Sequence, residues 1–317
     1  NKVAIFGTSV FAIAGYYTDY DHLQHVIAAA NNGDVYEVHW DPVTLDPSEV
    51  APGHPPVKQL GHFDNMVTIA GFFTSDDNYH HAVAGTRVAG TSGGTLHELY
   101  FRLDETPNSR DPLYHINSFD PNKGAASFYS PGDNLRHVVL VDSLGNPIDI
   151  SWNAQQAPRD DRITISPNDS QVASISGFLS SYDANPNTRH IIVARNDTGQ
   201  IYDIDYPDQQ NIPQDIRGQD NVYVKTTFNE RVKNVTAFFS SDNKYRHIVV
   251  LTQANLLKDH AYEKDGGNLR STQLTSSALA NNVADITSFY NAHDHLRHVL
   301  YATKDGNLYE ITYTSQG

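Results

Sequence analysis

The chain has 317 residues, no cysteine, and a formal net charge of −15 with its 16 histidines neutral. The lack of cysteine excludes a disulfide framework and a thiolate metal site, and the acidic balance argues against nucleic acid and anionic membranes as partners. No apolar run is long enough to span a bilayer and no signal peptide is visible, so a secreted and a cytoplasmic location both stay open.

A short apolar segment, VAIFG from Val3, precedes a unit that reads GYYTDYDHLQHVIAAANNGDVYEVHW from Gly15. In this unit a small residue and two bulky ones end a first strand, and a polar turn follows. A second strand then begins at a histidine, and a third strand carries an acidic residue followed by an aromatic one. Units of the same pattern begin at Gly71, Ser127, Gly177, Ala237 and Ser288.

The histidine that begins the second strand marks the period of the repeat. It recurs six times, with spacings of 56, 56, 53, 57 and 51 residues, at His25, His81, His137, His190, His247 and His298. Weaker fourth strands are expected in VKQL from Val57, RITIS from Arg162, VYVKT from Val222 and STQLT from Ser271. Four-stranded antiparallel units of about 50 residues, repeated six times, predict an all-β, six-bladed β-propeller. An apolar period near two excludes a helical solenoid.

The two ends of the chain predict how the ring closes. Four residues follow Tyr313, which is too short for a fourth strand in the last unit. We expect residues 3–7 to supply that outer strand, because the pairing joins both termini and removes an open edge. The sequence therefore predicts a single domain over residues 1–317.

The repeated histidine, acid and aromatic residue form the candidate ligand-binding set. A carboxylate accepts hydrogen bonds from sugar hydroxyls, an imidazole donates one, and an aromatic face packs on the C–H side of a sugar ring. Shallow sites between blades would give multivalent binding. The candidate residues are His25, Glu37, Trp40, His81, Glu98, Phe101, His137, Asp149, Trp152, His190, Asp203, Tyr206, His298, Glu310 and Tyr313. In the fifth unit we expect His247 with Glu263, and Gly266 in place of the aromatic residue.

These units resemble the fungal fucose-specific lectins, a family of six-bladed propellers with a basic residue, a glutamate and an aromatic residue in a similar layout. The resemblance covers nearly the whole chain as a repeat pattern and implies carbohydrate binding. The chain departs from the family in having histidine where the family has arginine. An arginine stands one position earlier at Arg136, Arg189, Arg246 and Arg297, but neighbouring strand residues face opposite sides of a sheet.

A structural role for the histidines stays open beside the ligand role. An aspartate lies four residues before the histidine in four units, at Asp21, Asp77, Asp133 and Asp294, and an acid there could lock the turn and orient the imidazole. DHLQH and HDHLRH have metal-like spacing, but a solvated turn or a structural histidine is the preferred interpretation. We therefore predict no metal and no cofactor.

Three functions compete for this fold. A lectin needs several similar sites, whereas an enzyme at the propeller mouth needs a singular one, for which the loops Val88–Gly94 and Pro207–Gln219 are the candidates. A protein-interaction scaffold is the third. Because the candidate set is repeated, binding is favoured over catalysis. We expect glycans as partners, without nucleic acid or membrane insertion, and leave a homodimer open.

Overall fold

The computed structural model describes residues 2–42, 57–103, 105–162, 172–180, 188–195, 197, 199–207, 222–227, 230–263 and 270–314. These residues form six four-stranded antiparallel sheets, which confirms the predicted six-bladed propeller. In five sheets the strands follow chain order from the axis outward. The sixth has the order β1-β24-β23-β22, with the N-terminal strand outermost.

The first three blades span Val10 to Arg162 and contain four strands each. Blade 1 contains β2 (Val10–Tyr17), β3 (Gln24–Ala30), β4 (Asp34–Trp40) and β5 (Lys58–His62). Blade 2 contains β6 (Met66–Thr74), β7 (Tyr79–Arg87), β8 (Gly94–Phe101) and β9 (Asn108–Ile116). After the 3-10 helix η2 (Pro121–Lys123), blade 3 contains β10 (Ala126–Ser130), β11 (Leu135–Val141), β12 (Pro147–Trp152) and β13 (Arg159–Arg162).

The last three blades repeat the arrangement. Blade 4 contains β14 (Val172–Ser180), β15 (Thr188–Arg195), β16 (Gln200–Pro207) and β17 (Val222–Thr227). Blade 5 contains β18 (Val232–Ser240), β19 (Tyr245–Thr252), β20 (Leu257–Tyr262) and β21 (Arg270–Gln273). Blade 6 contains β22 (Val283–Asn291), β23 (Leu296–Thr303) and β24 (Asn307–Tyr313), completed by β1 (Lys2–Ile5).

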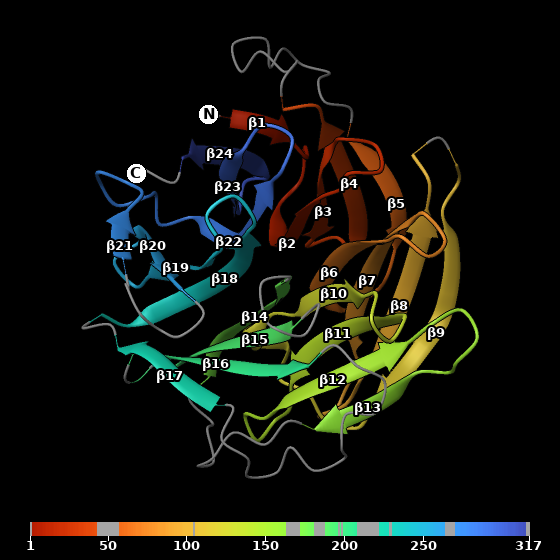
Figure 1. Cartoon of the computed structure of the whole chain (residues 1–317). Coiled ribbons are helices and arrows are strands. Elements are labelled where there is room, and N and C mark those ends of the chain that lie inside the picture. Colours follow the sequence, from red (N-terminus) through yellow and green to blue (C-terminus); the bar gives the residue numbers. More distant parts are fainter. Residues whose placement is uncertain are drawn as a thin grey trace.

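The first strands of the six blades line the axis and close a ring (Figure 1). Each contacts the first strand of the next blade, and β22 contacts β2 to complete the circle. The expected closure by an N-terminal strand is confirmed, since Ala4 pairs with Leu308 and Ile5 with Asn307, but the strand covers Lys2–Ile5 and not residues 3–7. The backbone N–H of Phe6 also donates to the carbonyl of Gly306 at 2.9 Å.

Burial explains why the second strands are the most apolar ones. Strands β3, β11 and β19 are buried at every position, because each lies inside its sheet and has a neighbouring blade on both faces. The apolar side chains meet between blades: Leu300 and Leu308 of blade 6 pack in one cluster with Val26 and Val38 of blade 1. The core therefore consists of layers between blades.

A left-handed residue shapes the turn from the first to the second strand in the five blades where that turn is described. Its φ lies between 58° and 61° at His22, Asn78, Asn134, Lys244 and His295. Asparagine is tolerated in this conformation more readily than most residues. The turn delivers the second-strand histidine to the same place in each of these blades.

One expected fourth strand is shifted along the chain. Strand β13 covers Arg159–Arg162, whereas the expected strand began at Arg162, and the rest of RITIS lies outside the described residues. Polar residues form β13 because it is the outer strand and pairs only with β12. Strands β5, β17 and β21 overlap the segments expected from the sequence.

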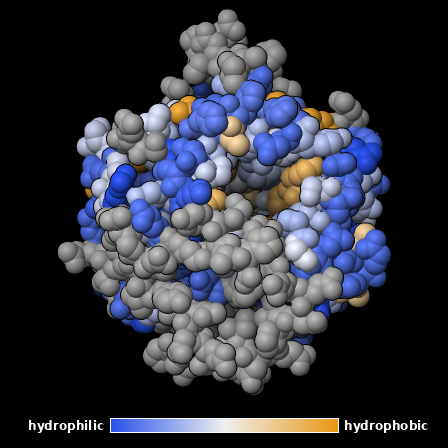
Figure 2. All heavy atoms as spheres, in the orientation of Figure 1, coloured by the Kyte–Doolittle hydropathy of each residue, from blue (hydrophilic) through white to orange (hydrophobic). Residues whose placement is uncertain are grey.

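One face of the molecule is mainly hydrophilic, with a hollow near its middle and hydrophobic residues along one wall of that hollow (Figure 2). No helix among the described residues is long and apolar enough to cross a bilayer.

Candidate functional site

The six strand-leading histidines are all buried, and none is more than 3% exposed. Each imidazole stacks on an aromatic ring of the first strand of its own blade, with centroids 4.7–5.3 Å apart and planes within 17° of parallel. The stacking partners are Tyr16, Phe72, Phe128, Phe178, Phe238 and Phe289. Packing thus fixes the plane of every ring.

A carboxylate on the third strand holds the Nδ1 atom of each histidine. The Nδ1–oxygen distances lie between 2.7 and 3.2 Å in all six blades. The acids are Glu37, Glu98, Asp149, Asp203, Asp259 and Glu310, in chain order. The structure therefore brings together the histidine–acid pairs expected in blades 1, 2, 3, 4 and 6.

The pair expected in blade 5 is wrong. His247 contacts Asp259 at 2.8 Å, while Glu263 accepts a hydrogen bond from the hydroxyl of Tyr245 at 2.8 Å. The β19–β20 hairpin has the same length as that of blade 1, so the acid lies twelve residues after the histidine in both. Three residues further on, Tyr262 occupies the aromatic position, and Gly266 lies outside the described residues.

The turn before the second strand supplies a partner for Nε2. Asp21 lies 3.1 Å from Nε2 of His25, and Asp294 lies 3.0 Å from Nε2 of His298. In blade 2 the Thr74 hydroxyl contacts Nε2 of His81 at 2.9 Å, and Asp77 binds that hydroxyl. An imidazole held on both nitrogens and stacked on a ring matches the structural role that the sequence left open.

The aromatic residues of the candidate set connect one blade to the blade before it. Trp40, Phe101 and Trp152 are buried. The indole Nε1 of Trp152 in blade 3 donates to Glu98 of blade 2 at 3.2 Å, and the hydroxyl of Tyr262 in blade 5 donates to Asp203 of blade 4 at 2.8 Å. Tyr313 is partly buried, and the side chain of Tyr206 lies outside the described residues.

The residue immediately before each histidine reaches back to the preceding blade, a feature that the sequence interpretation missed. Arg136 donates to Asp77 at 2.5 Å, and Arg189 donates to Ser130 at 2.8 Å and also to Asp133. Arg297 donates to Ser240 at 2.8 Å and through Nε to His247 at 3.3 Å.

The remaining three interfaces follow the same geometry. Arg246 lies 3.7 Å from Asp203, the Gln24 amide lies 3.0 Å from the His298 ring, and His80 lies 3.4 Å from Asp21. Adjacent strand residues do face opposite sides of a blade. In a propeller both sides are interfaces, so the histidine faces the following blade and the residue before it faces the preceding blade. Each interface therefore combines a histidine–acid pair from one blade with a basic or amide side chain from the next.

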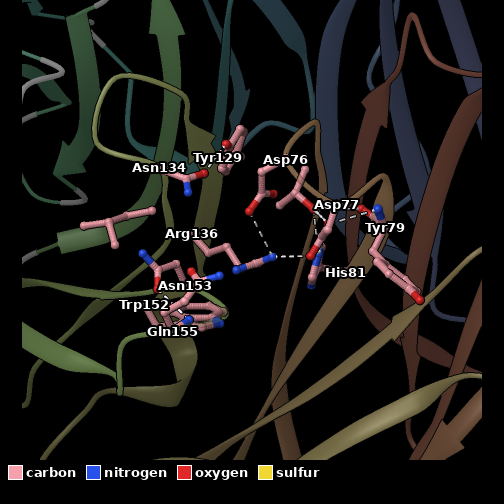
Figure 3. A network of polar contacts seen from close by, with 12 residues as sticks. Asp76, Asp77, Tyr79, His81, Tyr129, Asn134, Arg136, Trp152, Asn153 and Gln155 are labelled. Atoms are coloured by element: carbon pink, nitrogen blue, oxygen red, sulfur yellow. Dashed lines mark hydrogen bonds and ion pairs between the residues drawn. The ribbon is translucent and has the colours of Figure 1, made fainter.

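The interface between blades 2 and 3 shows the set most completely (Figure 3). Arg136 points from β11 across to Asp76 and Asp77 in the turn of blade 2, at 3.6 and 2.5 Å. Its Nε and Nη1 atoms are buried without a hydrogen-bond partner among the described residues. Asn134 and Gln155, both exposed, lie nearby on the blade 3 side of the gap, where the Asn134 amide accepts from Tyr129 at 2.6 Å.

The paired charges shift the pKa values of several members. Burial opposes ionisation of Glu37 and Asp133. Hydrogen bonds from His25 and His39 to Glu37, and the positive charges of His137 at 3.8 Å and Arg189 beside Asp133, nevertheless lower each pKa to about 2. Burial opposes protonation of His25, but its bonds to Asp21 and Glu37 raise its pKa. An imidazolium between two carboxylates is therefore stabilised.

The axial channel is narrow and polar. A cavity of about 90 Å³ is lined by residues of all six first strands, including Ser174, Asn234 and Asp285. Burial raises the pKa of Asp285 to about 6, although the backbone N–H groups of Ile13 and Ile286 donate to it. Of the loops considered for a singular catalytic site, Val88–Gly94 carries no acid, base or nucleophile pair, and residues 208–219 lie outside the described part of the chain.

Solved structures similar to this chain include several lectins, one of them described as a six-bladed β-propeller, while no family model and no curated protein matches it. AofleA from Arthrobotrys oligospora has 12% identity and a TM-score of 0.65, over 98% of this chain and 86% of its own. A lectin from Burkholderia pseudomallei has 14% identity and a TM-score of 0.63, over 97% and 82%. The fucose-specific lectin from Aleuria aurantia has 12% identity and a TM-score of 0.56, over 99% and 94%.

Proposed function

We propose that this protein is a multivalent carbohydrate-binding lectin with sites at the blade interfaces. The observation that carries the proposal is the repetition of one polar constellation around the ring, with a histidine–acid pair from one blade facing a basic or amide side chain from the next. Repetition suits a binding protein, because several equivalent weak sites add avidity. The lectins among the structural neighbours support the same interpretation.

At each site the buried residues form the floor and the turn residues form the mouth. Between blades 2 and 3, the floor is the buried guanidinium of Arg136, beside the buried pair of His81 and Glu98. The mouth offers the carboxylates of Asp76 and Asp77, whose side chains are 19% and 31% exposed, together with exposed amides. Carboxylates and amides accept from vicinal hydroxyls, and Arg136 beneath them holds the two carboxylates in position.

We propose four sites rather than six. An arginine reaches the preceding blade at Arg136, Arg189, Arg246 and Arg297, whereas Gln24 and His80 occupy this position in blades 1 and 2. Arginine presents a fixed fork of donors that glutamine and neutral histidine lack. Fucosides are the first ligands to test, because several structural neighbours are fucose lectins.

The test is a glycan array followed by titration calorimetry with the best monosaccharide. We expect about four sites per chain, and Arg136→Gln should remove one of them while the circular dichroism spectrum stays unchanged. Glutamine is a tolerated residue here because Gln24 occupies the same position in blade 1. Gln24→Ala is the matched control and should leave the site number unchanged. A chain that binds no glycan, or an Arg136→Gln variant with its site number intact, would overturn the proposal.

A further inference from the structure

The interface between blades 1 and 2 differs from the others in holding a histidine cluster. His80 takes the position that arginine has in four blades, and its ring lies over that of His25, with centroids 4.4 Å apart. Nε2 of His25 lies 3.1 Å from Oδ2 of Asp21, and Nε2 of His80 lies 3.4 Å from the same atom. The two imidazole rings are 0% and 1% exposed.

These three atoms have the spacing of metal ligands. Bonds of about 2.0–2.1 Å at tetrahedral angles place neighbouring ligand atoms roughly 3.3–3.4 Å apart. The two distances to Asp21 lie close to that value, and all three ligand atoms lie within 4.8 Å of one another. Two imidazole nitrogens and one carboxylate oxygen suit Zn²⁺ and its neighbours Co²⁺, Ni²⁺ and Cu²⁺.

The surrounding residues orient both rings. The Nδ1 atom of His25 lies 3.2 Å from Glu37, and Nδ1 of His80 lies 3.2 Å from the hydroxyl of Tyr16. A proton held at Nδ1 leaves the Nε2 lone pair for a metal, which is the usual carboxylate–histidine–metal arrangement. Tyr16 also stacks on His25 at 5.2 Å, and His39 holds Glu37 at 2.8 Å.

Comparison with the other interfaces explains what the substitution changes. Where an arginine faces the turn aspartate of the preceding blade, as Arg136 faces Asp77, a permanent cation neutralises the acid. His80 offers a neutral nitrogen instead, so two acids, Asp21 and Glu37, meet three imidazoles. We propose that Asp21, His25 and His80 bind one divalent transition-metal ion of the zinc class, which ties the turn of blade 1 to blade 2.

This site was not predicted from the sequence, where no metal was expected. His25 and Asp21 belong to DHLQH, but the third ligand comes from the next blade, 55 residues after His25. His25, Glu37 and His39 form an overlapping trio on the other side of the same ring. The test must therefore separate the two trios.

The experiment titrates chelator-treated, full-length protein with zinc chloride by calorimetry. We expect one ion per chain, a raised melting temperature with zinc, and visible d–d absorption of tetrahedral geometry when cobalt chloride replaces zinc. His80→Arg installs the residue found in four other blades, so it should keep the fold and weaken binding at least about 100-fold. His115→Gln, which removes an exposed imidazole from β9 of the same blade, is the control and should bind zinc as the parent does.

Two results would overturn the proposal: no zinc bound by the parent protein, or zinc bound equally well by His80→Arg. Binding that survives His80→Arg but disappears in His39→Gln would assign the ion to the other trio instead. If His80→Arg does not fold by circular dichroism, the isosteric Asp21→Asn variant gives the same comparison.

Discussion

At the scale of single residues, the imidazole of His247 shows what the repeated histidine does. Its Nδ1 atom meets Asp259 at 2.8 Å, its Nε2 atom accepts from Nε of Arg297 at 3.3 Å, and Phe238 stacks on it at 4.7 Å. Every polar atom of the ring is engaged, and the ring lies between blades 5 and 6. The histidine therefore holds two blades and an acid in place, beneath the surface where a ligand would arrive.

We expect His247→Ala to lower the free energy of unfolding by about 3 kcal/mol, because it leaves a buried carboxylate without its imidazole. Urea denaturation measures the change. His115→Ala is the control on an exposed position and should change stability by less than about 0.5 kcal/mol. A loss for His247→Ala no larger than that of the control would contradict the structural role.

The buried carboxylates and histidines of the blade interfaces predict that stability is highest at mildly acidic pH. The pKa values of Glu37 and Asp133 are lowered, so their contribution is present above the ordinary carboxyl values of 3.8–4.5 and is lost as pH falls toward about 2. The pKa values of His25, His137 and His298 are raised, because their acid partners outweigh burial. Their contribution is present below 6.5 and is lost as pH rises through the raised values.

Three further groups titrate on the acid side of neutral pH and act in opposite directions. Asp285, with its pKa raised from 3.8 to about 6, contributes stability at low pH that is lost as pH rises from about 3.8 through about 6. Burial lowers the pKa of His260 to about 4 and that of His80 as well, so these two favour neutral pH. With four groups against two, unfolding free energies measured from about pH 3 to about pH 9 should peak between about 4.5 and 6.5. A maximum above about pH 7.5 would contradict this.

At the scale of elements, the hairpin between β23 and β24 couples the C-terminal blade to the N-terminal strand. Gly306 has a φ of +81°, and a Cβ atom there would lie 2.1 Å from the carbonyl oxygen of Thr8. Its own carbonyl accepts from Phe6 at 2.9 Å. The turn therefore needs glycine for its conformation and for the close approach of the N-terminal segment.

Gly306→Ala should destabilise the protein by more than Gly90→Ala does. Gly90 also has a positive φ, +77°, but a Cβ atom there would meet nothing within 4 Å. The Gly90 variant thus reports the conformational cost alone, about 1–2 kcal/mol, and the Gly306 variant adds a clash with backbone. Thermal melting of both variants measures the difference, and equal melting temperatures would show that the hairpin does not clamp the N-terminal segment.

At the scale of the whole molecule, ring closure depends on β1. Val3 and Ala4 are each 2% exposed and Phe6 is 6% exposed, so this short segment buries apolar surface as well as pairing with β24. Without it, β24 would present an open edge to other chains. The same strand therefore closes the ring and covers an edge through which two chains could associate.

Deleting residues 1–6 should lower stability by about 3–6 kcal/mol, from the burial of Val3 and Phe6, and the melting temperature by roughly 10 °C. The shortened chain should also associate through β24, which light scattering detects. Ile5→Ala, at a position 53% exposed in the same strand, is the control and should melt with the parent protein. An unchanged melting temperature after the deletion would contradict closure by β1.

The sequence by itself determined the six units, their all-β class and the closure by VAIFG, because strand period, turn residues and repeat length are local properties of the chain. It also located five of the six histidine–acid pairs, since a hairpin of fixed length sets that spacing. The fifth pair was misassigned because Tyr262 and Glu263 imitate the Tyr-Glu pattern of other units. Whether the candidate residues bind a glycan stays a prediction.

Only the tertiary structure decided which blades meet. Arg136 reaches Asp77, 59 residues away, and His80 reaches Asp21 across the same kind of interface. Within one unit, the arginine or His80 and the histidine that follows it point to opposite faces of the strand. Nothing in their spacing shows that each of these two faces packs against a different neighbouring blade. That relation arises when six sheets pack face to face around an axis, because each interface is then built from two units at once.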